Sequence, residues 1–139
     1  MELVTKNFGT ISYDENKVID FPEGIPAFEE MKKFVILGEP DTDFFYLQST
    51  EDGNLSFVLL DVQKLMPNYD PMVKEEQIFC LGEIKNNISI YNVCVIKDTL
   101  ENMTVNLMAP IVINNDTNKG KQVILENNEY SIKHSLITE

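Results

Sequence analysis

The chain has 139 residues, 43% of them hydrophobic, and its 23 acidic side chains outnumber 11 basic ones, so the net charge is −12. All the basic residues are Lys. Proteins that bind nucleic acids neutralise phosphates with cations and read bases mainly with Arg, so this composition argues against DNA, RNA and anionic membranes as partners. An acidic chain attracts basic proteins, although acidity can also serve solubility alone.

The length suits one domain, which we expect to span residues 1–139. No apolar run approaches the roughly 20 residues of a membrane-spanning helix. The N-terminal residues also lack the basic and then apolar pattern of a signal peptide. We therefore expect a cytoplasmic protein, in which Cys80 and Cys94 are reduced, buried core thiols.

The first half of the chain alternates short β-type runs with turn signals. One or two helical turns are expected around residues 27–33. The Asp-Gly pair in the turn at residues 51–54 favours a tight hairpin between the runs on either side. The strands expected in this half are 3–8, a hairpin within 11–21, 33–38, 44–50 and 55–62.

The second half continues the pattern after one interruption. Residues 63–76 contain two prolines, so any helix there is short and interrupted. Further strands are expected at 77–84 and 88–97, joined as a hairpin, and at 103–115, 122–126 and 130–137. About nine or ten strands with almost no helix predict an all-β fold, because a closed sheet leaves no exposed edge. We expect a small antiparallel β-barrel-like single domain with one or two short helical turns.

The segment MTVNLMAPIVINN, residues 103–115, has two different faces. Its odd positions are all apolar, which is typical of a strand that packs one face on a core. The odd positions are Met103, Val105, Leu107, Ala109, Ile111 and Ile113. The even face mixes polar and apolar residues: Thr104, Asn106, Met108, Pro110, Val112 and Asn114. This face either contacts a partner or is buried as well, with Asn106 hydrogen-bonded to the backbone.

No motif for catalysis or metal binding is evident. The only His, His134, lies on an apolar strand face, and no spacing suggests a partner for a nucleophilic triad. The glycines occur singly and form no phosphate-binding loop. The paired carboxylates are adjacent in sequence, so they point apart on a strand. We therefore expect no catalytic residue, no metal ligand and no cofactor, and a protein that acts by binding.

Five stretches, in order from end to end, together resemble the FliW family of flagellar assembly factors. They are FGTISYDENKVIDFPEGIPAFEE (8–30), YLQSTEDGNLSFVLLD (46–61), PNYDP (67–71), MTVNLMAPIVIN (103–114) and GKQVILENNEYSIKHSL (120–136). The family usually has Gly where this chain has Ala27, a difference that concerns backbone freedom in a turn. The resemblance implies a small, helix-poor, β-barrel-like protein without catalytic activity.

The resemblance also implies two partners. Proteins of this family are similar in binding CsrA, a dimeric RNA-binding translational repressor, and flagellin, through its helical terminal region. Flagellin that accumulates occupies the FliW-like protein, so CsrA is freed and represses flagellin translation, and secretion of flagellin reverses this. The implied function is a non-enzymatic assembly factor that antagonises CsrA and alternatively binds flagellin as a chaperone-like partner.

Two surfaces are candidates for partner binding, the even face described above and the end of a strand with its turn. Their residues are Thr104, Asn106, Met108, Pro110 and Val112 on the first, and Gln48, Ser49, Glu51 and Asp52 on the second. The second can equally be a solvated hairpin. Two other functions stay open: a barrel that binds a small ligand in an apolar lumen, and a hydrolase with a carboxylate-bound metal.

Overall fold

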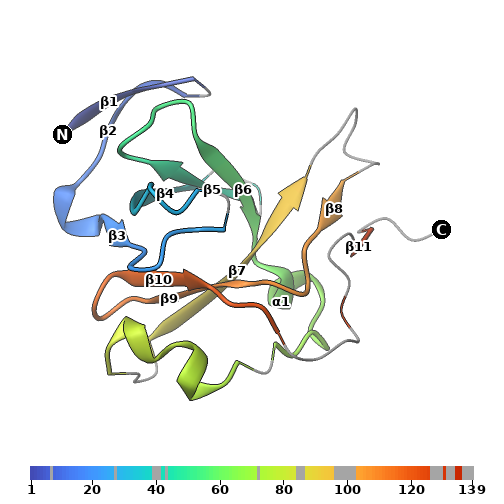
Figure 1. The fold of residues 1–139 in the computed structure, drawn as a ribbon. Helices are drawn as coiled ribbons and strands as arrows, with labels where there is room; N and C mark the ends of the chain where they lie inside the picture. Colours follow the sequence, from blue (N-terminus) through green and yellow to red (C-terminus); the bar gives the residue numbers. More distant parts are fainter. Residues whose placement is uncertain are drawn as a thin grey trace.

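The computed structural model describes residues 1–6, 8–26, 28–38, 42, 44–71, 73–83, 87–95, 103–125, 130 and 134–135 (Figure 1). The strands in these residues are β1 (Glu2–Thr5), β2 (Gly9–Ser12), β3 (Ile19–Asp20), β4 (Lys33–Gly38), β5 (Phe44–Ser49), β6 (Ser56–Leu60), β7 (Ile88–Val95), β8 (Thr104–Val105), β9 (Ile111–Asn114), β10 (Lys119–Gln122) and β11 (His134–Ser135). The helical segments are η1 (Glu15–Lys17), α1 (Val62–Leu65), η2 (Glu75–Gln77) and η3 (Phe79–Leu81), of which all but α1 are 3₁₀ turns.

Seven of the described strands close into a barrel. Their order is β7-β6-β5-β4-β3-β10-β9, and β9 pairs back onto β7, from Ile88 opposite Asn114 to Tyr91 opposite Ile111. The neighbours are antiparallel except β3 and β10, which are parallel. β1 and β2 form a separate hairpin beside the barrel (Figure 1). The predicted all-β barrel is confirmed, and the parallel pair is a difference from the antiparallel sheet expected.

The interior of the barrel is filled by side chains. Because successive residues of a strand point to opposite faces, alternate positions of each strand face inward. The interior cluster consists of Ile19, Phe21, Ile25, Phe34, Leu47, Leu59, Ile111 and Ile113. The rings of Phe21 and Phe34 meet edge to face with their centroids 5.2 Å apart. This filled interior does not favour the alternative of a ligand in an open lumen.

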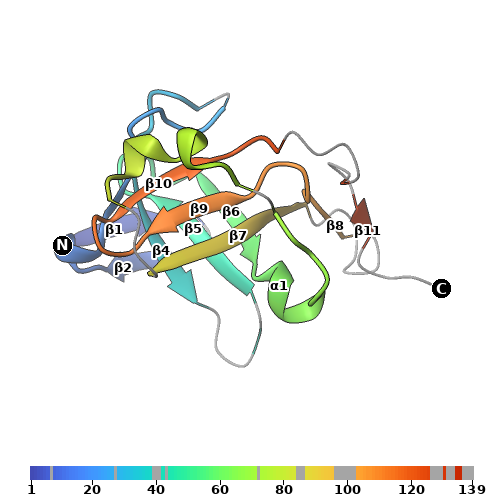
Figure 2. The same cartoon turned by 90° about the horizontal axis from the view of Figure 1, so that it is seen from below.

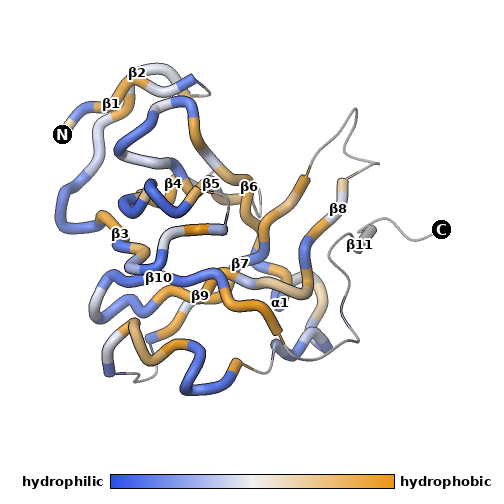
Figure 3. The backbone as a smooth tube through the Cα atoms, viewed as in Figure 1, coloured by the Kyte–Doolittle hydropathy of each residue, from blue (hydrophilic) through white to orange (hydrophobic). Residues whose placement is uncertain are grey.

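Two further clusters cover the outside of the barrel. Near β6 and β7 the cluster contains Leu60, Val62, Tyr69, Cys94, Met103, Val105 and Leu107. Over β9 it contains Ile78, Leu81, Val112, Val123 and Leu125, so that η2 and η3 lie against β9 and β10 (Figure 2). The colouring by hydropathy agrees with this arrangement, with β9 hydrophobic except at its last residue, Asn114, and η1 hydrophilic (Figure 3). Parts of β7 and β9 are therefore buried on two faces.

Several predicted elements are confirmed. The strand expected at 33–38 is β4, and those expected at 44–50 and 55–62 contain β5 and β6. The strand expected at 88–97 contains β7, and its last two residues lie outside the described residues. The short, interrupted helix expected in 63–76 corresponds to α1 followed by turns.

Other predicted elements are wrong in the described part of the chain. The hairpin within 11–21 does not form, since β2 pairs with β1 while β3 pairs with β4 and β10. Residues 28–33 contain turns in place of the expected helical turn, and Ala27 lies outside the described residues. The strand expected at 122–126 is displaced, because β10 ends at Gln122. Of the strand expected at 130–137, the structure describes Tyr130 and β11.

The strand expected at 77–84 is also wrong, and so is the single strand at 103–115. Residues 77–81 contain the end of η2 and the whole of η3, where Ile78 and Leu81 face the core at a spacing of three residues. The segment 103–115 is split into β8 and β9 by an irregular stretch. Cys80, on η3, is half-buried, whereas Cys94 on β7 is buried as expected.

Candidate functional site

The two faces of segment 103–115 are both largely buried. Every odd position is buried, as predicted. On the even face Pro110, Val112 and Asn114 are buried, while Thr104, Asn106 and Met108 are half-buried. Val112 packs under η3 with Leu81. These placements favour the alternative in which the fold itself covers the even face, and they leave three of its side chains within reach of a partner.

Asn106 follows β8 and precedes the bend at residues 107–109. Its Oδ1 atom accepts hydrogen bonds from the backbone N–H groups of Met108 and Ala109, each at 3.0 Å. Its carbonyl oxygen accepts a hydrogen bond from Asn92 Nδ2 at 2.9 Å. The hydrogen bonds to the backbone expected for a buried Asn106 are present.

The turn between β5 and β6 is held by the residues predicted there. Gln48 and Ser49 are fully buried. Ser49 Oγ accepts hydrogen bonds from the N–H groups of Glu51 and Asp52, at 3.1 and 3.0 Å. Gln48 Nε2 donates to the carbonyl oxygen of Leu55 at 3.1 Å. Of the four predicted contact residues, Glu51 is exposed and Asp52 half-buried, so these two are the ones that a partner can reach.

Glu51 also joins this turn to the start of β4. Its Oε1 atom accepts hydrogen bonds from the backbone N–H groups of Lys32 and Lys33, at 2.8 and 3.0 Å. A charged acceptor that satisfies two N–H groups stabilises the local backbone more than a neutral one does. The carboxylate therefore has a structural role in addition to any contact with a partner.

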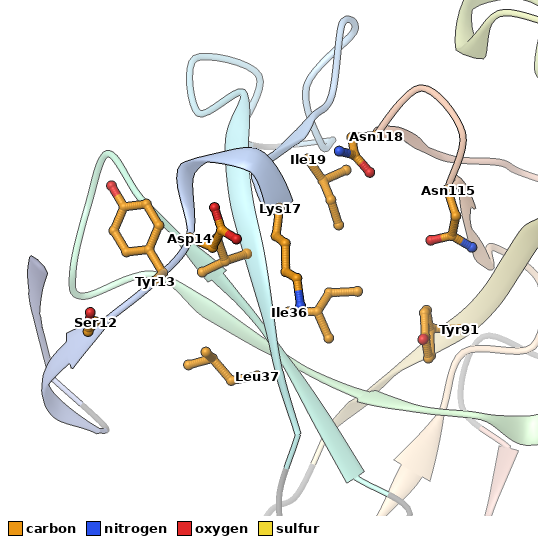
Figure 4. Close-up of a pocket in the computed structure, with 11 residues that line it drawn as sticks. Ser12, Tyr13, Asp14, Lys17, Ile19, Ile36, Leu37, Tyr91, Asn115 and Asn118 are labelled. Carbon is orange, nitrogen blue, oxygen red and sulfur yellow. The ribbon is translucent and has the colours of Figure 1, made fainter. Parts of the chain in front are cut away.

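A hollow of about 560 Å³ opens between β4, β7, η1 and the β9–β10 turn (Figure 4). We call it the mouth hollow. Ile36 and Tyr91, which pack on the interior cluster, are only half-buried and line it, so it lies at an end of the barrel. Polar residues of η1 and of the turn surround this apolar floor, and in Figure 4 the side chain of Lys17 extends toward Ile36.

Hydrogen bonds fix the polar rim of the mouth hollow. Asp14 Oδ1 accepts from the N–H of Asn16 at 2.8 Å and caps η1. Asn118 has a positive φ of 55° and donates from Nδ2 to the carbonyl oxygen of Asn16 at 2.9 Å. Asn115 Nδ2 donates to Ser89 Oγ at 2.8 Å. The sequence did not reveal this hollow, because its lining comes from segments far apart in the chain.

A polar contact on another side joins η3 to the loop after β3. Glu23 Oε2 lies 3.1 Å from Lys121 Nζ, and it accepts a hydrogen bond from the Cys80 thiol at 3.3 Å. The bonds from Lys121 and then Cys80 lower the pKa of Glu23. Burial and then the nearby Glu23 raise the pKa of the Cys80 thiol, so it stays protonated. A protonated thiol is a poor nucleophile.

The described part of the chain has neither a grouping typical of a metal site nor a helix typical of a membrane segment. Among the described residues, no three His, Cys, Asp or Glu side chains are grouped so that they could hold a metal ion. In the same part of the chain, no helix has the length and apolar character needed to cross a bilayer. The side chain of His134 lies outside the described residues, although its backbone pairs with Val105.

Comparison with known proteins gives one consistent match. The family model described as FliW protein matches residues 2–136. The flagellar assembly factor FliW of Thermoanaerobacter pseudethanolicus is 45% identical over 142 residues, covering 100% of this chain and 95% of the relative. That of Caldanaerobacter subterraneus subsp. tengcongensis is 44% identical with the same coverage. A crystal structure of the flagellar assembly factor FliW has a TM-score of 0.92 and 35% identity, covering 99% of this chain and 98% of that one.

Proposed function

Since the chain belongs to the FliW family of flagellar assembly factors, we propose that it acts in the cytoplasm, without catalysis, by binding two proteins in turn. One partner is the RNA-binding repressor CsrA, which it antagonises, so that flagellin mRNA is translated. The other is flagellin, which displaces CsrA when it accumulates.

The observation that carries this proposal is the surplus of carboxylates at the surface. In the part of the chain that the structure describes, the exposed acidic side chains are Glu2, Asp14, Glu15, Glu23, Glu29, Glu30, Glu51, Asp70, Glu75, Glu76, Glu83 and Asp116. The exposed lysines among the described residues are half as many: Lys6, Lys17, Lys32, Lys33, Lys64 and Lys74. An RNA-binding repressor presents cations to phosphates, so it is attracted to such a surface and associates with it rapidly.

The same charge supplies a mechanism of inhibition. A carboxylate-rich domain docked beside the RNA-binding surface places negative charge near incoming phosphates, within the Debye length of about 8 Å at physiological salt. Each tenfold loss of RNA affinity requires only about 1.4 kcal/mol of coupling between the two binding events. A few carboxylates at that distance suffice, so the bound chain acts as an acidic shield.

The mouth hollow favours flagellin as the second partner. Its apolar floor of Ile36, Leu37 and Tyr91 lies beneath the polar rim of Lys17 and the Asn115–Asn118 turn. An amphipathic helix docks in a groove of this kind by laying its apolar face on the floor. The helical terminal region of flagellin has the form that this hollow would accept.

The experiment measures the affinity of purified CsrA for flagellin leader RNA with and without a saturating amount of the chain. Saturation is checked at each salt concentration. The ratio of the two affinities is compared at about 50 and about 200 mM salt, because salt also weakens RNA binding by CsrA alone. We expect the chain to lower the RNA affinity of CsrA at both salt concentrations. The factor by which it lowers that affinity should be smaller at the higher concentration.

A chain that does not bind CsrA would refute the proposed function. Inhibition that is independent of salt would rule out the acidic shield and leave a change in the shape of CsrA as the mechanism. Addition of purified flagellin should restore RNA binding, and failure to do so would remove flagellin as the competing partner.

A further inference from the structure

An exposed aromatic ring stands on η3, at a residue that is not among the predicted contacts. Phe79 is 85% exposed, although Ile78 and Leu81 on either side of it are buried. Ile124, 62% exposed, lies in the segment joined to η2, since Gln77 Nε2 donates to the Ile124 carbonyl oxygen at 2.9 Å. A large apolar side chain at the centre of an interface is a frequent anchor of protein contacts.

The exposure of Phe79 results from a well-anchored backbone. Asn114 Nδ2 donates to the carbonyl oxygens of Leu81 and Glu83, each at 3.0 Å, and Thr117 Oγ1 donates to that of Leu81 at 2.7 Å. Gly82 ends η3 with a φ of 89°, and a Cβ atom there would meet the Thr117 methyl group at 3.0 Å. Because this backbone is already ordered, binding through the ring requires little further ordering of the main chain.

Two glutamates line a hollow together with the ring. A hollow of about 520 Å³ is lined by Glu75, Phe79, Gly82 and Glu83, and we call it the η3 hollow. Glu75 and Glu83 are exposed at its rim, and Glu76 is exposed beside Glu75. An aromatic face with carboxylates around it attracts a Lys or Arg side chain by cation–π and ionic contact together, and Arg is a frequent anchor of interfaces.

We propose that the η3 hollow is where the basic protein partner docks, with a cationic side chain placed over Phe79 and between Glu75 and Glu83. This inference rests on the proposed function, in which that partner is CsrA. It assigns the contact to η2, η3 and the residues after β10, and not to the β5–β6 turn or the even face of 103–115. The charge of the rim excludes an acidic segment as the occupant.

The test measures the dissociation constant of purified CsrA for the chain and its variants by calorimetry. Phe79→Ala should weaken binding at least about tenfold, as expected for a central aromatic anchor. Its matched control, Val4→Ala, removes a side chain that is 74% exposed on β1 and should change affinity less than about twofold. Both side chains are exposed, so neither variant should shift the urea unfolding midpoint.

The charge of the rim is tested by Glu83→Lys against Glu2→Lys. These two variants have the same net charge, so a larger loss for Glu83→Lys locates the contact, whereas equal losses would indicate only long-range attraction. Wild-type binding of CsrA with no effect of Phe79→Ala and equal effects of the two charge variants would overturn this inference and leave the proposed function standing. Loss of flagellin binding with CsrA binding unchanged would also overturn it. Failure of the wild-type chain to bind CsrA would refute both.

Discussion

The side chains of two asparagines form hydrogen bonds with backbone groups at positions where strands end. Asn106 satisfies two N–H groups after β8, and Asn114, fully buried, donates to two carbonyl oxygens of the η3 segment and accepts from the N–H of Asp116 at 3.0 Å. A buried polar backbone group without a partner costs about 1–3 kcal/mol. These residues are therefore constrained by the fold, whatever the partners require.

We predict that Asn106→Ala lowers the free energy of unfolding by about 1–2 kcal/mol, because the N–H groups of Met108 and Ala109 lose their acceptor. Asn106→Asp keeps an acceptor oxygen and should retain more of the stability. Urea denaturation gives both values, and CsrA affinity should stay near that of the wild type. An unchanged melting temperature with abolished binding would restore the even face as a partner surface.

At the scale of the element, β9 differs from a strand with one solvent face. Ile113 belongs to the interior cluster, and its neighbour Val112 belongs to the cluster under η3. The near-continuous apolar run IVI therefore reflects burial on both sides, as in strands covered on two faces. The alternation in residues 103–109 gave the correct buried positions, but it could not show that Asn106 would break the strand.

We predict that Val112→Ala and Ile113→Ala both destabilise the chain, by about 1–3 and about 2–5 kcal/mol, because each leaves a cavity in a different cluster. Val95→Ala, at a half-exposed end of β7, is the control and should cost less than about 1 kcal/mol. Unfolding midpoints in urea provide the comparison. A negligible effect of Val112→Ala would mean that η3 does not cover β9.

The elements that the sequence predicted well are those with one simple pattern. The run KFVILG gave β4 with its bounds, since it is apolar and followed by turn residues. The strand β10, KGKQ, has no apolar pattern in its sequence. Its inward position is Gly120, which lies under the ring of Phe21, because a Cβ atom there would approach a ring carbon to 2.7 Å. The run QIFCLG looked like a strand because its residues are apolar, and only the spacing of Ile78 and Leu81 indicated a helical turn. The mouth hollow combines distant segments, so no local pattern could reveal it. The η3 hollow is lined by residues 75–83 alone, and it was missed because this run was predicted to be a strand.

At the scale of the whole molecule, the charge of −12 acts on folding as well as on binding. Like charges on a compact surface repel one another, and unfolding moves them apart. The ion pairs Lys33–Asp20, at 2.8 Å, and Lys121–Glu23 offset only a small part of this, because solvent screens ion pairs at the surface. Added salt should therefore stabilise the folded chain and weaken its attraction to a basic partner.

We predict that the melting temperature rises by about 2–4 °C when sodium chloride increases from about 10 to about 150 mM, as the Debye length falls from about 30 to about 8 Å. The association rate with CsrA should fall over the same range. A variant with Glu2, Glu15 and Glu30 changed to Gln should melt higher at low salt and respond less to added salt. A melting temperature that falls with salt would show that attractive pairs dominate.

The parallel pairing of β3 with β10 determines when the barrel can close as the chain is synthesised. Asp20 pairs with Lys119, so β3 waits for a strand that is synthesised about a hundred residues later. Native pairings so distant along the chain slow folding, because the long intervening loop must be closed first. A nascent chain lacking β9 and β10 leaves the edges of β3 and β7 without neighbours, and such edges aggregate. The barrel can thus close only after β10 has been synthesised, and chain termination before about residue 120 should yield insoluble product.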